Sequence, residues 1–210
     1  PMTITGTGGN ATFDTLDSAD LTTSRTITLS GALSNTGGAG FTKTGAGVLS
    51  LTAASSTFSG TATVNGGTLQ LSTGALASGT VQVDAGGTIQ PGTISTPGAG
   101  AVASLNMNGG NAAFRVGGSP EILTVTGAFN VAAASSISAL PAGPIAGPFP
   151  LTYTVIDYAG SVGGLGSGAL SFSSANPHLS GVLIDDVVNT EIKVQVNAAD
   201  TVIWKGNVNG

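Results

Sequence analysis

Apolar and polar residues alternate along most of the chain, in short segments that follow a glycine. The segments VLSL, TLQL, TIQP and NAAF come directly after Gly47, Gly67, Gly87 and Gly110. Their apolar residues lie two positions apart, which is the periodicity of a β-strand. No segment shows sustained 3.6-residue periodicity with capping residues, so the pattern predicts an all-β protein with at most one short helix.

These four glycines recur about every 20 residues, and second strands such as TATV at 61–64 and TVQV at 80–83 lie between them. A period of this length built from strands and turns predicts a β-solenoid, in which each strand pairs in parallel with its equivalent one coil later. Glycine suits the corners because it adopts positive φ and allows close backbone approach. A β-sandwich is the structural alternative. The fixed glycine period favours the solenoid.

A proline-rich segment divides the chain. Residues 141–150 hold four of the nine prolines, and proline lacks the N–H group that a strand ladder requires. We therefore predict solenoid coils over 1–140, a Pro/Gly-rich interruption over 141–150 and a less regular C-terminal β extension over 151–210. The extension is rich in β-branched residues, and we expect antiparallel or flanking strands in it.

One part of the chain resembles a known repeat family. Residues 41–72 follow the pattern K-T-G-x-G-x-L-x-L, then an aromatic residue with S-G, then V-x-x-G-x-L-x-L. The matching residues are Lys43, Thr44, Gly45, Gly47, Leu49, Leu51, Phe58, Ser59, Gly60, Val64, Gly67, Leu69 and Leu71. This segment resembles the autotransporter-associated β-strand repeat, also called the passenger-associated transport repeat. The resemblance implies a right-handed parallel β-helix in a secreted or surface-displayed bacterial protein.

Composition excludes several classes of function. The 210 residues include five Lys and Arg, ten Asp and Glu, one His and no Cys. Disulfides and thiolate metal sites are therefore absent, a zinc site lacks ligands, and no basic face can form for nucleic acid. A hydrophobic share of 40% with a net charge of −5 predicts a folded chain. No stretch approaches the roughly 20 apolar residues of a spanning helix, so we expect no membrane span.

Three carboxylates form the candidate metal site. Asp14, Asp17 and Asp20 lie three residues apart in FDTLDSADL and could supply oxygen ligands to Ca²⁺. The alternative is a polar loop in which each Asp accepts a local backbone hydrogen bond. We expect no other cofactor.

Other polar residues indicate surface positions rather than catalysis. Asp185 and Asp186 are adjacent, and neighbours within a strand point to opposite faces, so they cannot converge on one substrate. His178 lies in a segment with turn composition, and Lys43 belongs to the turn pattern of the repeat, which predicts a solvated corner. With five Lys and Arg in the whole chain, we expect that the protein is not an enzyme.

The two ends of the predicted solenoid indicate self-association. The segment PMTITGTGGNATF has no charged side chain and no helix signal, and the segment TVIWKGNVNG is similarly strand-like, so neither contains a cap for open strand edges. We predict a subunit interface that includes Ile4, Phe13, Ile203 and Trp204. The resulting hypothesis is an extracellular structural protein of the bacterial cell surface that assembles head to tail, with itself as partner, into a filament or stalk.

Two alternatives remain. A passenger fragment acting as an adhesin or glycan-binding module, with surface glycans or other cells as partners, would need an exposed aromatic or polar groove. Phe41, Phe58, Phe114 and Phe129 occupy inward positions of the pattern, which weakens this alternative. The other is an enzyme on a β-helix, which turnover of an acidic polysaccharide would reveal.

Overall fold

The fold is known from a computed structural model, which describes residues 1–199 except 6–9, 18, 21, 54–56, 94–95, 120, 144, 146 and 175. Strands dominate these residues, and the one helical element among them is the 3₁₀ turn η1 (Ser167–Ala169). This agrees with the predicted all-β class. None of the described residues belongs to a helix with the length and hydrophobicity needed to cross a membrane.

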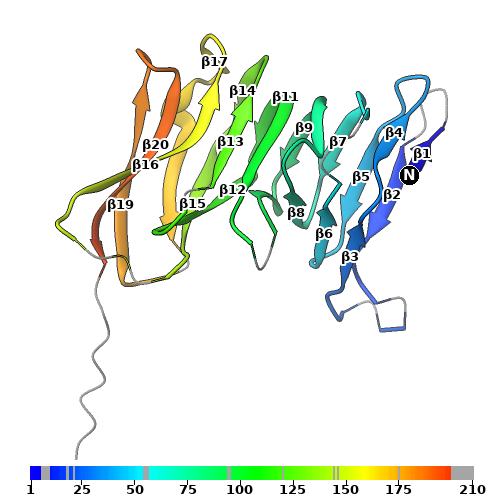
Figure 1. Cartoon of the computed structure of the whole chain (residues 1–210), viewed down its shortest axis with the longest axis horizontal. Helices are drawn as coiled ribbons and strands as arrows, with labels where there is room; N and C mark the ends of the chain where they lie inside the picture. Colours follow the sequence, from blue (N-terminus) through cyan, green and yellow to red (C-terminus); the bar gives the residue numbers. More distant parts are fainter. Residues whose placement is uncertain are drawn as a thin grey trace, which may run out of the picture.

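The strands form two long sheets and one small sheet (Figure 1). The larger sheet contains β2 (Ala11–Asp14), β5 (Phe41–Thr44), β7 (Thr61–Val64), β9 (Leu76–Asp84), β11 (Ala99–Asn108), β13 (Ile122–Val125), β14 (Phe129–Ala133), β16 (Leu151–Tyr158), β17 (Val162–Gly164), β19 (Leu179–Asp186) and β20 (Glu191–Ala199). The second contains β3 (Thr26–Leu29), β6 (Val48–Leu51), β8 (Gly67–Leu71), β10 (Gly87–Pro91), β12 (Asn111–Val116), β15 (Ser135–Pro141) and β18 (Leu170–Ser174). The small sheet pairs β1 (Met2–Ile4) with β4 (Leu33–Asn35).

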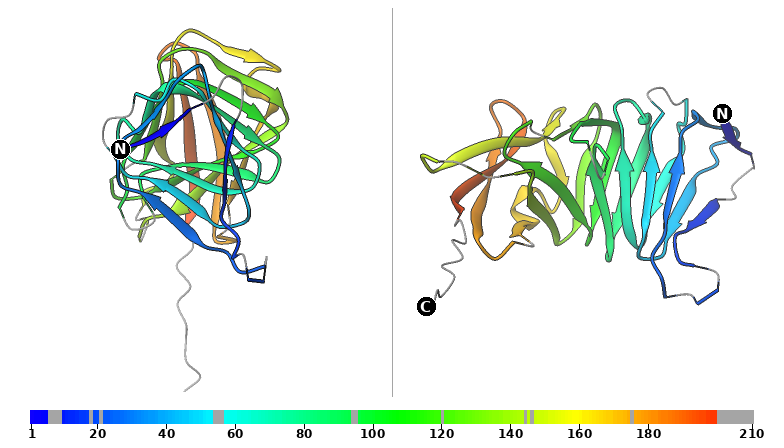
Figure 2. Two further views of the ribbon diagram at one scale, coloured as in Figure 1. Left: turned by 90° about the vertical axis from the view of Figure 1, so that its right-hand side faces the viewer. Right: turned by 60° about the horizontal axis from the view of Figure 1, so that its bottom comes forward.

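Successive coils stack in parallel, as the glycine period predicts. Leu49 of β6 pairs with Leu69 of β8, which pairs with Ile89 of β10. The three positions are evenly spaced, so the coil length equals the glycine period. The view along the long axis in Figure 2 shows the coils wound around a common interior. The parallel β-solenoid is therefore confirmed, and the chain does not form the alternative β-sandwich.

Gly47 and Gly67 lie at corners where the backbone approaches the preceding coil closely. A Cβ atom on Gly67 would lie 2.3 Å from the Gly47 carbonyl oxygen, and Gly67 has a φ of +62°. A Cβ atom on Gly47 would lie 2.0 Å from the Arg25 carbonyl oxygen. Each corner therefore lies against the backbone of the preceding coil, where only glycine fits.

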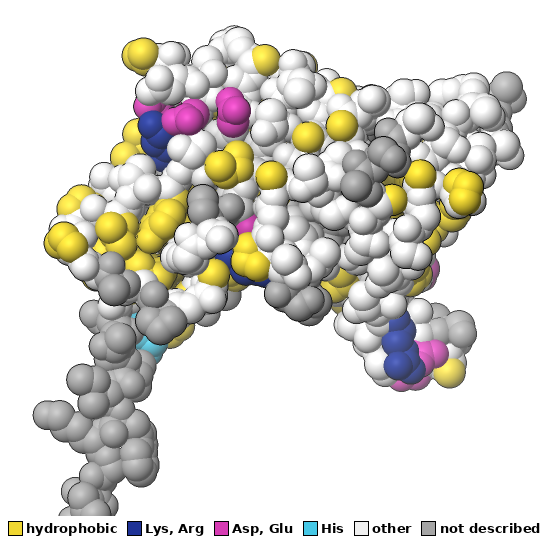
Figure 3. Space-filling view, in the orientation of Figure 1, with side chains coloured by type: hydrophobic (Ala, Val, Ile, Leu, Met, Phe, Trp, Pro, Cys, Tyr) yellow, Lys and Arg dark blue, Asp and Glu magenta, His cyan; other side chains and the backbone are white. Residues whose placement is uncertain are grey.

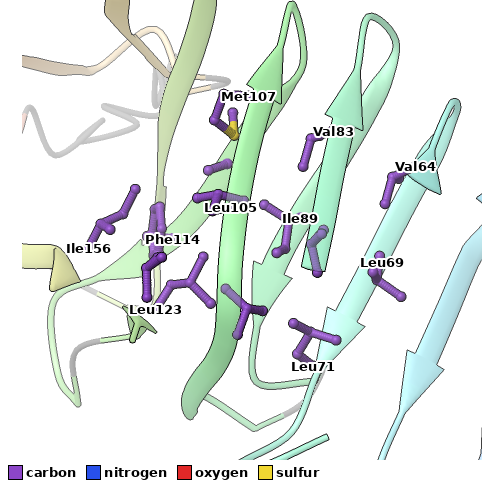
Figure 4. Close-up of a cluster of buried hydrophobic side chains, with 14 of the residues drawn as sticks. Val64, Leu69, Leu71, Val83, Ile89, Leu105, Met107, Phe114, Leu123 and Ile156 are labelled. Carbon is purple, nitrogen blue, oxygen red and sulfur yellow. The ribbon is translucent and has the colours of Figure 1, made fainter. Parts of the chain in front are cut away.

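Inward side chains fill the solenoid. Figure 4 shows aliphatic side chains of successive coils lying along the interior, among them Leu69, Ile89 and Leu105, all of which are at most 1% exposed. Phe41, Phe58, Phe114 and Phe129 are also at most 1% exposed. The pattern places these rings inward, and the structure confirms it.

The C-terminal part changes strand direction. Within the described residues, 142–150 contain no strand, and β16 follows them at Leu151. β16 still pairs in parallel with β13, but its other neighbour, β20, is antiparallel, and β20 pairs antiparallel with β19. The solenoid is thus followed by an antiparallel hairpin, in line with the expected irregular β extension.

Candidate functional site at the ends of the solenoid

Strand edges are open at the N-terminal end. Strands β1, β2 and β3 each pair with one strand of the next coil, β4, β5 and β6 respectively, and with no other strand in the described part of the chain. An open edge presents unpaired backbone N–H and C=O groups, which can template pairing with another strand. This end therefore offers backbone groups to a partner.

The apolar interior is also partly exposed at this end. The Phe13 ring packs edge-on against Phe41 with centroids 5.4 Å apart, and the Phe41 centroid lies 5.4 Å from that of Phe58. Phe41 and Phe58 are fully buried, whereas Phe13 is half-buried. Ile27 of β3 is likewise half-buried. The row of inward side chains thus continues to the N-terminal end, where the described residues leave it partly exposed.

The predicted interface residues have different locations. Phe13 lies at the open end, as described above. Ile4 is only 5% exposed and belongs to the core, so its side chain is not available to another copy. Burial follows from the pairing of β1 with β4, which a local pattern does not reveal. Ile203 and Trp204 lie outside the described residues.

The segment 201–210, on which the prediction of an uncapped C-terminal end rests, lies outside the described residues, and a β-hairpin ends the part of the chain that the structure describes. Because β20 is antiparallel to both neighbours, β19 runs in the same direction as β16. The hairpin also packs against β18: a Cβ atom on Gly181 would lie 3.1 Å from the Phe172 ring. Val182 of β19 remains 45% exposed. A hairpin with a free, partly apolar outer strand therefore ends the described part of the solenoid.

The candidate calcium ligands are engaged separately. Asp14, Asp17 and Asp20 each accept, through Oδ1, a hydrogen bond from the backbone N–H two residues further along, at 3.1, 2.9 and 2.9 Å. This is the local turn pattern given above as the alternative to a metal site. Within the described residues, no three acidic, His or Cys side chains lie together so that they could hold a metal ion. The structure does not bring these three carboxylates together.

Hydrogen bonds lower the pKa of two of these carboxyl groups. The Ala19 amide, followed by the Arg25 side chain, lowers the pKa of Asp17. The Thr23 hydroxyl and amide lower the pKa of Asp20 to about 2. Both carboxylates are therefore ionised at neutral pH and stabilise the loop before β3.

Lys43 is the charged residue whose location differs most from the prediction. Its side chain is fully buried, and Nζ lies 2.8 Å from each of four acceptors, Thr15 Oγ1 and the carbonyl oxygens of Thr44, Gly45 and Gly66, which share its three hydrogens. These acceptors belong to three successive coils. The ammonium group therefore joins the coils from inside one corner.

The prediction of a solvated Lys43 is wrong, whereas His178 is exposed in a turn as predicted. A signal for burial was present: Lys43 lies two residues after the inward Phe41, so strand alternation points it inward. Burial lowers the pKa of Lys43 to about 8, and the charge of Asp14 acts in the opposite direction. The amine is still protonated at pH 7.

A second buried charge was not predicted. Glu121 is fully buried and accepts a 2.7 Å hydrogen bond from the Arg115 amide, while Arg115 Nε lies 3.4 Å from Glu121 Oε1. Arg115 also donates to the Thr93 carbonyl oxygen. Burial raises the pKa of Glu121, and the contacts with Arg115 lower it. Arg115 lies in β12, and through these contacts it joins the turn before β13 to the loop after β10. The sequence does not indicate these contacts.

Asp185 and Asp186 point to different partners, as their adjacency in a strand predicts. Asp185 accepts hydrogen bonds from Tyr158 Oη at 2.7 Å and Ser167 Oγ at 2.5 Å. Asp186 forms an ion pair with Lys193 at 2.5 Å. The two carboxylates therefore do not converge on one site.

Comparison with protein families identifies one segment. Residues 41–71 match the passenger-associated-transport-repeat model. A search of curated proteins found no match to the chain. The matched residues comprise β5 to β8, including the glycine corners and the buried Lys43. Residues 41–71 are therefore similar to a passenger-associated transport repeat, and in the structure they form parallel coils of the β-solenoid.

Proposed function

We propose that the chain is a non-enzymatic structural protein of the bacterial cell surface, whose solenoids associate head to tail into a filament or stalk. The observation that carries this proposal is that the free strand edges at its two ends run in the same direction. The passenger-type repeat supports a location outside the cell.

Strand direction makes the two ends compatible. All strands from β2 to β16 in the larger sheet are parallel, and two reversals return β19 to that same direction. If β2 of a second copy lies beside β19, the pair is parallel. In the other sheet, β3 and β18 are the terminal strands and are also parallel. Head-to-tail stacking at β19 would therefore continue the larger sheet without reversal, and the second sheet has the same strand direction at both of its ends.

Backbone groups suited to this pairing lie along β2. The amides of Ala11 and Thr15 donate to carbonyl oxygens of the next coil, each at 3.1 Å. Because residues along a strand face alternate sides, the N–H and C=O groups of Thr12 and Asp14 face the free edge. Each new hydrogen bond would contribute about 0.5–1.5 kcal/mol.

Apolar surface supports the same contact. Figure 3 shows hydrophobic side chains at both ends of the molecule. Phe13 and Ile27 are half-buried at the N-terminal end, and Val182 is 45% exposed at the C-terminal end. Burial of such surface stabilises an interface by about 25 cal/mol per Å². A heterologous contact of this kind propagates unless a rotation closes it.

Charge opposes association at low salt. The N-terminal end carries three aspartates with Arg25, and the C-terminal hairpin carries Asp185, Asp186 and Glu191 with Lys193. Both ends are thus acidic and repel each other. Salt screens this repulsion over a Debye length of about 8 Å at physiological ionic strength. Association should therefore strengthen as salt is added.

Proline at the free edges tests the proposal. Arg25 and Leu29 accept hydrogen bonds from the next coil, so Thr26 and Thr28 of β3 face outward. Thr12→Pro with Thr28→Pro removes one outward N–H from each edge and leaves the internal ladder intact. Light scattering should show assembly for the wild type and for the matched Thr12→Ala, Thr28→Ala control, but monomers for the proline variant. Equal assembly by all three proteins would refute the proposed contact.

An outward amide ladder favours the adhesin as a second candidate function. Asn130 Nδ2 donates to Asn106 Oδ1 at 2.9 Å, and Asn106 Nδ2 donates to Gln82 Oε1 at 3.4 Å. These side chains form a polar row across the coils that could hydrogen-bond sugar hydroxyls. Glycan-array binding that is lost in Asn106→Ala would support this function, and an array without signal would exclude the tested glycans.

A further inference from the structure

Two cavities flank the Asp185 carboxylate near the end of β19. One, of about 360 Å³, lies between Tyr158, Ser161, Ser167 and Val187. The other, of about 270 Å³, lies between Ser167 and the apolar side chains of β18 to β20. Asp185 and Ser167 line both. Space for a small ligand is therefore available on two sides of one carboxylate.

The hydrogen bonds of this carboxylate determine what the cavities can accept. Tyr158 and Ser167 each have a single hydroxyl hydrogen, and both hydrogens are donated to Asp185, at 2.7 and 2.5 Å. The free lone pairs of the two hydroxyl oxygens and of the carboxylate remain as acceptors. A ligand that pairs with this group must therefore bring hydrogen-bond donors.

The charge of Asp185 is not balanced by a neighbouring side chain. Asp186 pairs with Lys193, which also contacts Glu191 at 2.8 Å. Asp185 forms no ion pair within the described part of the chain, although its two hydroxyl partners hold it in place. A cationic donor would supply the missing charge and a charge-assisted hydrogen bond.

Exposed aliphatic side chains lie beside the cavities. Val187 lines the larger cavity and is 70% exposed, its neighbour Val188 is 87% exposed, and Leu165 is 63% exposed two residues before Ser167. They are among the most exposed large hydrophobic residues that the structure describes. An aliphatic chain that leaves the carboxylate can pack against them, as the stems of lysine side chains do on apolar surfaces.

We propose that the Asp185 cavities bind a primary ammonium group carried on an aliphatic stem. A diamine or a lysine side chain has this chemistry. A divalent metal ion fits less well, because Ca²⁺ takes six to eight oxygen ligands, usually with several carboxylates, and Asp185 is the one carboxylate among the described residues that line these cavities. The inference does not depend on the assembly proposed above.

The test is an NMR titration of the ¹⁵N-labelled full chain with cadaverine. Saturable shifts should appear at residues 160–168 and 185–188, and 1-pentanol, the neutral analogue, should not reproduce them. Asp185→Asn should weaken binding about tenfold, because the ionic hydrogen bond is lost while an acceptor oxygen remains. Asp157→Asn removes an exposed carboxylate from β16 and serves as the matched control, with unchanged binding.

Further arms separate the possible outcomes. Nα-acetyl-lysine methylamide that binds as well as cadaverine would identify a lysine side chain as a ligand source, and weaker binding would favour a free diamine. Val187→Ser should weaken binding about threefold by removing apolar contact, and it gives an independent test if Asp185→Asn does not fold. Equal binding of 1-pentanol, competition by Ca²⁺ at equal concentration, unchanged binding in both variants, or no saturable shift would each overturn the proposal.

Discussion

The repeated coils at 41–91 and the C-terminal end at 151–199 stabilise the same fold in different ways. In the coils, each strand pairs with its counterpart one glycine period later, and the buried Lys43 side chain joins three coils through contacts of its ammonium group with four acceptors. At the C-terminal end the chain reverses direction, and ion pairs such as Asp186 with Lys193 lie at the surface. Removal of a buried contact in the coils should thus reduce the free energy of unfolding strongly and independently of salt. Removal of an ion pair in the hairpin should reduce it less, and the loss should depend on salt.

The largest expected effect comes from Lys43→Met. It removes the ammonium group from four acceptors. The Thr44 carbonyl oxygen keeps its hydrogen bond from the Thr15 amide, whereas a buried acceptor left unpaired costs about 1–3 kcal/mol. We expect a loss of about 4 kcal/mol in the free energy of unfolding, measured by urea denaturation. Lys193→Met, at the surface of the hairpin, is the matched control and should cost much less. Equal losses would contradict the difference between the two regions.

Glycine substitutions separate close packing from backbone conformation. Gly67 and Gly38 both have positive φ, but a Cβ atom would clash with the preceding coil only at Gly67. Gly67→Ala should therefore cost about 3 kcal/mol and Gly38→Ala about 1 kcal/mol, the latter from left-handed backbone strain alone. Thermal unfolding of both variants measures the difference. Similar losses of stability in the two variants would mean that the close approach of neighbouring coils does not require glycine at the corners.

The hairpin should respond to salt. Asp186 pairs with Lys193, which lowers the pKa of Asp186, and both side chains are near the surface. Asp186→Asn should reduce the melting temperature slightly at low ionic strength and hardly at all at high ionic strength, because salt screens exposed pairs. The loss in Lys43→Met should persist in both conditions. A salt-independent loss in Asp186→Asn would show that this end does not depend on screened charges.

The smallest expected effect is a change in the pH dependence of stability in acid. Hydrogen bonds from Thr23 lower the pKa of Asp20 to about 2, below its ordinary value of 3.8. The unfolded chain therefore binds a proton first as pH falls, so the stability that Asp20 contributes is present above about pH 4 and lost between about pH 4 and 2. Asp20→Asn should show a shallower decline over this range in pH-dependent unfolding. An identical decline would mean that Asp20 does not contribute.

Much of the fold follows from local chemistry. Alternation identifies the strands, the spacing of Gly47, Gly67 and Gly87 gives the coil length, and the prolines mark the interruption. Burial of Lys43 conflicts with its charge, and strand alternation proves the better guide. The direction of β19 and the burial of Ile4 depend on pairing between distant segments. The hydrogen bond of Arg115 to Thr93, 22 residues earlier in the chain, similarly forms only when the coils stack.

Electron microscopy of the purified chain distinguishes end-to-end association from a monomer. Head-to-tail stacking predicts filaments in which successive solenoids point in the same direction, which become more abundant with salt and are absent for the Thr12→Pro, Thr28→Pro variant. Single particles of monomer size at all protein and salt concentrations would contradict it. So would pairs joined by two identical ends.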